Sequence, residues 1–284
     1  YVTSTSNGNS HRYLELSAIN SGTRNDNQLF LSYIDKQIGM GTNAPDDNSF
    51  GAGHGVLAVA SATGSAKTAM LNLMGDGNDT DASRVASVFF NDQSATGAGK
   101  SLAGIEAYRA SNHATDPGGD LVFSTNLSGG SYAEKMRIHS EGFVTMPLQP
   151  SVGVSLTDQN NMATTPTTLD FDTERFDQNS DFNTGTNTFT APVTGKYLVC
   201  VNLYMKNTDN AADYYQLYIT SSNKTYYSIF DPDVSTDSAF WDMSWSAVID
   251  MDASDTVYFR MNQSGGAAQT DFDGQSYASI SLLH

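Results

Sequence analysis

The sequence contains a single cysteine and no long apolar run, and each absence excludes a class of protein. Because Cys200 is the only cysteine, no disulfide forms within one chain, so stability must come from packing or assembly. No stretch of about 18 consecutive apolar residues occurs, so no segment is suited to span a bilayer as a helix. The first residue is Tyr1 rather than methionine, which leads us to expect a fragment or a processed product.

Basic residues are also scarce, since 14 Lys and Arg stand against 31 Asp and Glu and give a formal net charge of −17. Residues 151–284 hold 17 of the acidic and only 5 of the basic residues. Such a surface repels phosphate backbones and anionic lipids, so we expect neither nucleic-acid binding nor membrane insertion. It suits a protein that stays soluble in salt, or one that collects hard cations.

Helical periodicity is lacking, and short segments of period two are separated by Gly, Asn, Asp, Ser and Thr instead. This pattern predicts an all-β fold. In the first half, the predicted strands cover residues 28–34, 84–90, 101–110 and 120–126. These strands contain many small residues and few large apolar ones, so we expect their core to be completed by other chains.

The second half contains clearer strands, at residues 197–206, 241–251 and 256–261. Each strand has one apolar and one polar face, which predicts a sandwich of antiparallel sheets. Trp241 and Trp245 fall on an apolar face, so we expect them in the core or at a subunit interface rather than in a sugar-binding surface.

A change in composition near residues 146–154 marks the predicted domain boundary, because Pro147 and Pro150 interrupt strand pairing there. We therefore expect a β-rich stem over residues 1–146, a joint at 147–150 and a β-sandwich head over 151–284.

No catalytic constellation emerges from the sequence, and we expect the protein not to be an enzyme. Residues 94–101 resemble a phosphate-binding loop, but Ser94 replaces its first glycine and a strand-like segment follows, which favours a hairpin turn. Two of the many carboxylates could serve glycoside cleavage, but the sequence does not pair them at the required separation.

Two groups of residues are candidates for binding. Asp231, Asp233 and Asp237 share one loop, where they repel one another unless a cation or solvent screens them. The alternatives are a Ca²⁺ site and a solvated loop, and we expect no other cofactor. The second group consists of tyrosines that would present flat platforms to sugars: Tyr214, Tyr218 and Tyr226.

One resemblance rests on Phe176, the loop DQNSDFNTGTN and the element FTAPVTGKYLV, in which Phe189, Pro192, Gly195 and Tyr197 fall at characteristic positions. Together they resemble the globular head of complement C1q and its tumour-necrosis-factor relatives. This resemblance implies a ten-strand jelly roll that assembles as a tight trimer.

A second resemblance covers the first half of the chain. DLVFSTNLSGGSYAEKMRIHSEGFVTMPLQP and QIGMGTNAP are similar to segments of bacteriophage tail fibres. The resemblance implies the distal part of a virion tail fibre or receptor-binding protein, outside the cell. Its implied partners are two copies of itself, other tail proteins, and a glycan or outer-membrane receptor on the host. The alternatives are a purely structural fibre or decoration protein and a polysaccharide depolymerase.

Overall fold

The computed structural model describes residues 2–7, 11–20, 23–32, 37–40, 57–59, 71, 73, 83–92, 101–111, 118–128 and 131–283. The chain divides into two compact units, Tyr1–Asp76 and Gly77–His284. Every regular element in the described ranges is a strand, which confirms the all-β prediction. Within these ranges, no helix has the length and hydropathy needed to cross a bilayer.

The first unit contains one sheet in which the strand order follows the chain. Its strands are β1 (Val2–Asn7), β2 (His11–Asn20), β3 (Thr23–Ser32), β4 (Gln37–Met40) and β5 (Leu57–Val59). Neighbours are antiparallel except for β4 and β5, which run parallel. The strand predicted at residues 28–34 corresponds to β3, which ends at Ser32.

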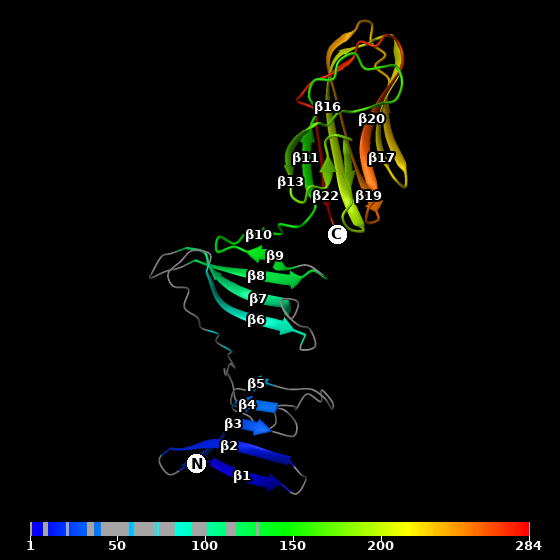
Figure 1. The fold of residues 1–284 in the computed structure, drawn as a ribbon. Coiled ribbons are helices and arrows are strands. Elements are labelled where there is room, and N and C mark those ends of the chain that lie inside the picture. Colours follow the sequence, from blue (N-terminus) through cyan, green and yellow to red (C-terminus); the bar gives the residue numbers. More distant parts are fainter. Residues whose placement is uncertain are drawn as a thin grey trace. The chain divides into compact units, whose positions relative to one another are not determined.

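The second unit begins with an antiparallel meander, which we name the stem sheet (Figure 1). Its strands are β6 (Arg84–Asn91), β7 (Ser101–Arg109), β8 (Gly119–Asn126), β9 (Tyr132–Ile138) and β10 (Val144–Thr145). Three of them confirm the strands predicted at residues 84–90, 101–110 and 120–126. Residues 94–100 of the segment that resembles a phosphate-binding loop lie outside the described residues. The last residue of that segment, Ser101, begins β7.

One face of the stem sheet is mostly polar and is held by ion pairs. The buried carboxylate of Glu106 accepts hydrogen bonds from Arg84, at 2.8 Å, and from Ser124, at 2.9 Å. Next to this group, a guanidinium nitrogen of Arg137 lies 2.8 Å from the carboxylate of Asp120. These side chains satisfy one another, so this face needs no further layer to pair its charges.

The opposite face of the stem sheet is apolar and open. Val88, Ile105 and Phe123 are cross-strand neighbours on three adjacent strands, which places them on one face. Ile105 is 38% exposed and Phe90, on the same face, is 53% exposed. An exposed apolar face of this kind is unfavourable in water, because burying apolar surface is the main contribution to the stability of a sheet. We therefore expect a partner to cover it.

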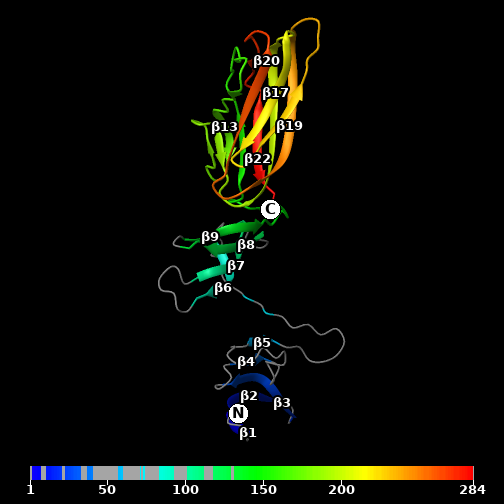
Figure 2. The same cartoon turned by 90° about the vertical axis from the view of Figure 1, so that its right-hand side faces the viewer.

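The head is a sandwich of two sheets (Figures 1 and 2). One sheet has the order β13 (Thr173–Asp177), β11 (Ser151–Ser155), β22 (Tyr277–Leu282), β16 (Gly195–Thr208) and β19 (Ser238–Met251). The other has the order β14 (Phe182–Asn183), β15 (Thr188–Thr190), β20 (Thr256–Gly265), β17 (Ala212–Ser221) and β18 (Thr225–Phe230). The short strands β12 (Thr167–Thr168) and β21 (Asp271–Phe272) pair with β20 and β16, respectively. Strands distant in sequence are therefore neighbours, as in a ten-strand jelly roll.

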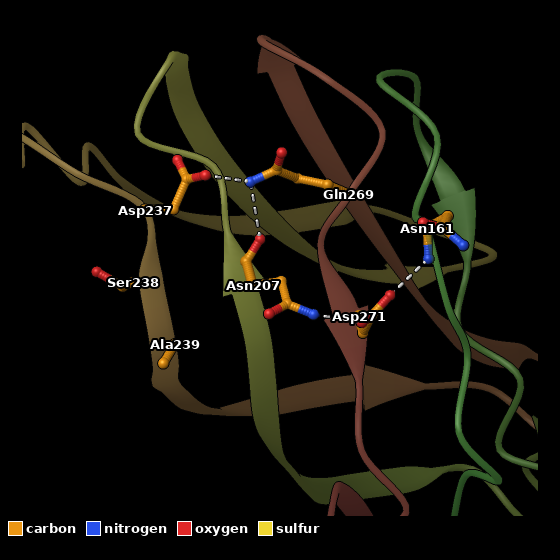
Figure 3. Close-up of a pocket in the computed structure, with 7 residues that line it drawn as sticks. All are labelled: Asn161, Asn207, Asp237, Ser238, Ala239, Gln269 and Asp271. Carbon is orange, nitrogen blue, oxygen red and sulfur yellow. Dashed lines mark hydrogen bonds between the residues drawn. The ribbon is translucent and has the colours of Figure 1, made fainter.

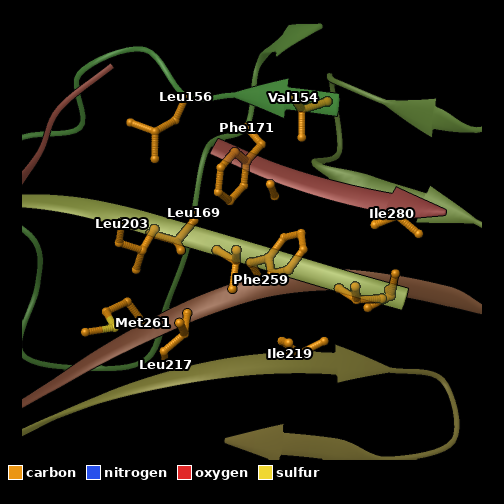
Figure 4. Close-up of a cluster of buried hydrophobic side chains, with 14 of the residues drawn as sticks. Val154, Leu156, Leu169, Phe171, Leu203, Leu217, Ile219, Phe259, Met261 and Ile280 are labelled. Atoms are coloured by element: carbon orange, nitrogen blue, oxygen red, sulfur yellow. The ribbon is translucent and has the colours of Figure 1, made fainter. Parts of the chain in front are cut away.

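The two sheets enclose one apolar core (Figure 4). The predicted inward faces are confirmed, since Val199, Leu203, Met251 and Phe259 are all buried. Trp241 and Trp245 are partly buried and pack against this core at the edge strand β19, in agreement with the core alternative of their prediction.

Hydrogen bonds explain the local structure of residues 176–199. The carboxylate of Asp177 accepts three of them, from the backbone N–H groups of Asn179, Asp181 and Phe182. The hydroxyl of Tyr197 donates to the carbonyl of Val193 at 2.7 Å and fixes the bend between β15 and β16. This segment is therefore scaffold.

The carboxylate of Asp181, just before β14, is partly buried, and its protonation depends on that burial. Burial raises the pKa of Asp181 above its ordinary value of 3.8. A hydrogen bond from Asn179 acts against this increase, and the neighbouring carboxylate of Asp177 adds to it. One of its carboxylate oxygens is buried without a hydrogen-bond partner. Because the folded state binds this proton more tightly than the unfolded state, stability falls as the pH rises through the raised pKa.

We therefore expect Asp181→Asn to raise the melting temperature by a few degrees at neutral pH. This gain should shrink as the pH falls, and disappear below 3.8. Thermal unfolding of both proteins across this pH range is the measurement. Asp250→Asn, which removes the same charge from an exposed position in β19, is the control. Equal effects of the two substitutions at every pH would contradict the prediction.

Candidate functional site

A polar pocket of about 480 Å³ lies at one end of the head (Figure 3). It is lined by Asn161, Asn207, Asp237, Ser238, Ala239, Gln269 and Asp271. These residues come from four segments: the loop after β11, the end of β16, the start of β19, and the segment leading into β21. Except for Ala239, every lining side chain carries a hydrogen-bonding group.

Hydrogen bonds between these segments hold the pocket in shape. The amide of Asn207 donates to the carboxylate of Asp271 at 2.8 Å, and the same carboxylate accepts from the backbone of Asn161, also at 2.8 Å. On the other side, the amide of Gln269 donates to Asp237 at 2.9 Å. The network keeps both carboxylates in place before any ligand arrives, which lowers the entropic cost of binding.

A buried polar network supports the loop that carries Gln269. The hydroxyls of Tyr215 and Thr270 lie 2.7 Å apart, and Thr270 donates to the side-chain carbonyl of Gln263 at 3.0 Å. The amide of Gln263 in turn donates to the carbonyl of Ala267 at 2.8 Å. Because these groups are buried, each lost bond costs about 1–3 kcal/mol, so the loop is firmly anchored.

Hydrogen bonds favour the ionised form of one carboxylate of the pocket. Hydrogen bonds from the backbone of Asn210 and from Gln269 lower the pKa of Asp237. A general acid for glycoside cleavage requires the opposite shift. Paired amides and ionised carboxylates are the groups that hydrogen-bond sugar hydroxyls.

The structure separates the three predicted calcium ligands. The carboxylate of Asp231 accepts a hydrogen bond from the backbone of Asp233 at 3.1 Å, whereas Asp237 belongs to the pocket. Among the residues that the structure describes, no group of three His, Cys, Asp or Glu side chains is placed to hold a metal. The single chain therefore gives no support to the Ca²⁺ hypothesis, which stays a prediction.

The three predicted tyrosines do not share a face. Tyr214 and Tyr218 alternate with the buried side chains of β17, but Tyr226 of β18 packs against the core. The register pairs Tyr226 with the buried Ile219, and pairs Tyr218 with Tyr227 instead. Tyr227, which was not predicted, is the exposed partner of Tyr218, at 59% exposure.

Sequence reasoning also missed Asn161, Asn207, Gln269 and Asp271. Asn207, near the end of β16, and Asn161, in the loop after β11, adopt positive φ angles, of 52° and 54°. Residues of this kind are common in loops, and no spacing in the sequence connects the four segments.

The head is similar to a known protein family. The C1q domain family matches residues 153–280. Among solved structures, the globular domain of zebrafish complement 1qA protein is similar at 19% identity and a TM-score of 0.38, covering 48% of this chain and 98% of that one. Among curated proteins, no sequence matches the chain. The family match and the order of the ten main strands together identify the C-terminal part of the chain as a C1q-like jelly-roll head.

Proposed function

We propose that this chain is the distal part of a bacteriophage tail fibre or related receptor-binding protein. In this proposal three copies assemble, and the heads attach the virion to a glycan or outer-membrane component of the host. The observation that carries the proposal is the preorganised polar pocket in the loops of the C1q-like head. The similarity of residues 120–150 to tail-fibre segments supplies the viral context.

Two features support a trimer. C1q domains commonly form trimers, and the open apolar face of the stem sheet needs a partner that would be supplied by copies of the same chain. Three identical heads present three weak sites, and simultaneous engagement converts weak affinities into firm attachment. Exposed sheet edges would also be covered in the assembly.

Adsorption competition tests the proposal. The purified chain, added in excess to phage and susceptible cells, is expected to block adsorption, and light scattering is expected to give three times the chain mass of 30.5 kDa. The double variant Asn207→Ala, Asp271→Ala removes one side of the pocket and should compete at least tenfold less well, since lost hydrogen bonds to a ligand cost about 1–3 kcal/mol.

Three outcomes would contradict the proposal. A monomer mass would remove the trimer. A chain that leaves adsorption unchanged would favour a structural fibre or decoration protein. Release of sugar products from host polysaccharide, abolished by changing one carboxylate, would favour a depolymerase.

A further inference from the structure

A cationic and aromatic patch lies on the outer face of the second head sheet, distinct from the polar pocket. We name it the Arg260 patch. Its central row is formed by Tyr227 of β18, Tyr218 of β17 and Arg260 of β20, which are cross-strand neighbours. The flanking rows hold Ile229, Gln216 and Asn262 on one side and Thr225, Thr220 and Tyr258 on the other.

Arg260 is held between two aromatic rings. Its guanidinium carbon lies 5.0 Å from the ring centre of Tyr218 and 5.8 Å from that of Tyr258. One terminal nitrogen donates to the hydroxyl of Thr220 at 3.3 Å. Contacts of this kind fix the plane of the guanidinium and reduce the entropy that it loses on binding a ligand.

The charge of Arg260 is not neutralised within the described part of the chain. The ion pairs there involve Arg84, Arg137, His139 and Lys206. No side chain of the three rows is acidic, although the chain as a whole carries a net charge of −17. In addition, the Nε atom of Arg260 is buried without a hydrogen-bond partner. The charge of Arg260 is therefore available to an anion from outside the chain.

The surroundings of Arg260 favour a sugar. Tyr227 and Ile229 of β18 are 59% and 50% exposed and offer apolar surface on the far side of Tyr218 from the cation. The hydroxyl of Tyr218 donates to the side-chain carbonyl of Gln216 at 2.6 Å. Burial raises the pKa of Tyr218 further above neutral pH. Tyrosine rings next to a guanidinium match the face and the carboxylate of an acidic sugar, whereas Gln216 and Thr220 are only 9% exposed.

We propose that the Arg260 patch binds a carboxylated sugar unit of a glycan, with the guanidinium pairing the carboxylate and the tyrosine rings packing against the sugar. This assignment rests on the proposed function in receptor binding, and it specifies an acidic glycan as the ligand class.

Binding of two oligosaccharides to the full chain tests the assignment: an oligogalacturonate and its fully methyl-esterified form, which differ in charge. We expect the wild-type chain to bind the acid form at least tenfold more tightly, because hydrogen bonds to charged groups contribute about 1.5–3 kcal/mol. The Arg260→Gln variant should lose this preference for the acid form, and the Arg260→Lys variant should retain only part of it. Arg175→Gln is the matched control, since it removes the same charge from β13 in the other sheet and should leave the preference intact. Unchanged melting temperatures would show that the variants fold.

The outcomes separate the two proposals. Equal binding of both oligosaccharides, or no change in Arg260→Gln, would overturn the acidic-sugar assignment while adsorption competition by the chain still upheld receptor binding. Equally tight binding of polyglutamate would show that the patch recognises acidic peptides instead. If the chain bound neither oligosaccharide, the assignment would also fail, and adsorption competition would decide separately whether receptor binding stands.

Discussion

Replacing Phe259 with alanine is expected to lower the free energy of unfolding of the head by about 3–5 kcal/mol. Phe259 is fully buried in β20, and its ring meets that of Phe171 edge-on at a centroid distance of 5.2 Å (Figure 4). Truncation loses both the burial of the ring and its contacts, and the β-sandwich cannot collapse fully around the resulting cavity. Since domains are stable by about 5–15 kcal/mol, much of the stability margin would be lost.

Denaturant unfolding followed by tyrosine and tryptophan fluorescence measures this effect. Phe259→Leu is the matched control, because it keeps most of the apolar volume and should cost about 1.5 kcal/mol or less. If the alanine variant were no less stable than the leucine variant, Phe259 would not lie at the centre of a packed core.

The second large effect is expected from Ile105→Lys on the apolar face of the stem sheet. If copies of the chain cover this face, the substitution places a charge in an apolar interface, which costs several kcal/mol. We expect limited proteolysis within residues 83–145 to become more than about tenfold faster, because each 1.4 kcal/mol of lost stability increases the open population tenfold.

Leu102→Lys is the control for this experiment. Leu102 lies in the same strand at 51% exposure, but by alternation it belongs to the face that carries Glu106. Light scattering of both variants would report whether the head alone maintains the trimer. Equal protease resistance of Ile105→Lys and the wild-type chain would mean that no copy covers the apolar face.

Period-two patterns predicted seven of the described strands, and for three of them, in the head, also the buried faces. In β16 up to Met205, in β19 from Trp241 and in β20 up to Met261 the apolar residues alternate regularly, so each inward residue implies the next. Trp241 illustrates the same logic, since its position two residues before Met243 placed it against the core. The resemblance carried by Phe189, Pro192, Gly195 and Tyr197 implied the jelly roll that the structure and the family match confirm.

The tyrosines illustrate where such patterns fail. Tyr226 and Tyr227 are adjacent, so one must face the core and the other the solvent, and the chemistry of the two side chains is the same. Only the register between β17 and β18, which pairs Tyr226 with Ile219, decides that Tyr227 is the outward one. The position of Arg260 between Tyr218 and Tyr258 follows from a further pairing, between β17 and β20.

The sequence by itself therefore determined the all-β class, the acidic surface and the buried faces of β16, β19 and β20, because these depend on composition and on neighbours one or two residues apart. The polar pocket and the Arg260 patch were decided only by the tertiary structure. Their residues are separated by tens of positions along the chain, from Asn161 to Asp271 in the pocket. Loops and strand registers bring them together, and no local pattern specifies these long-range pairings.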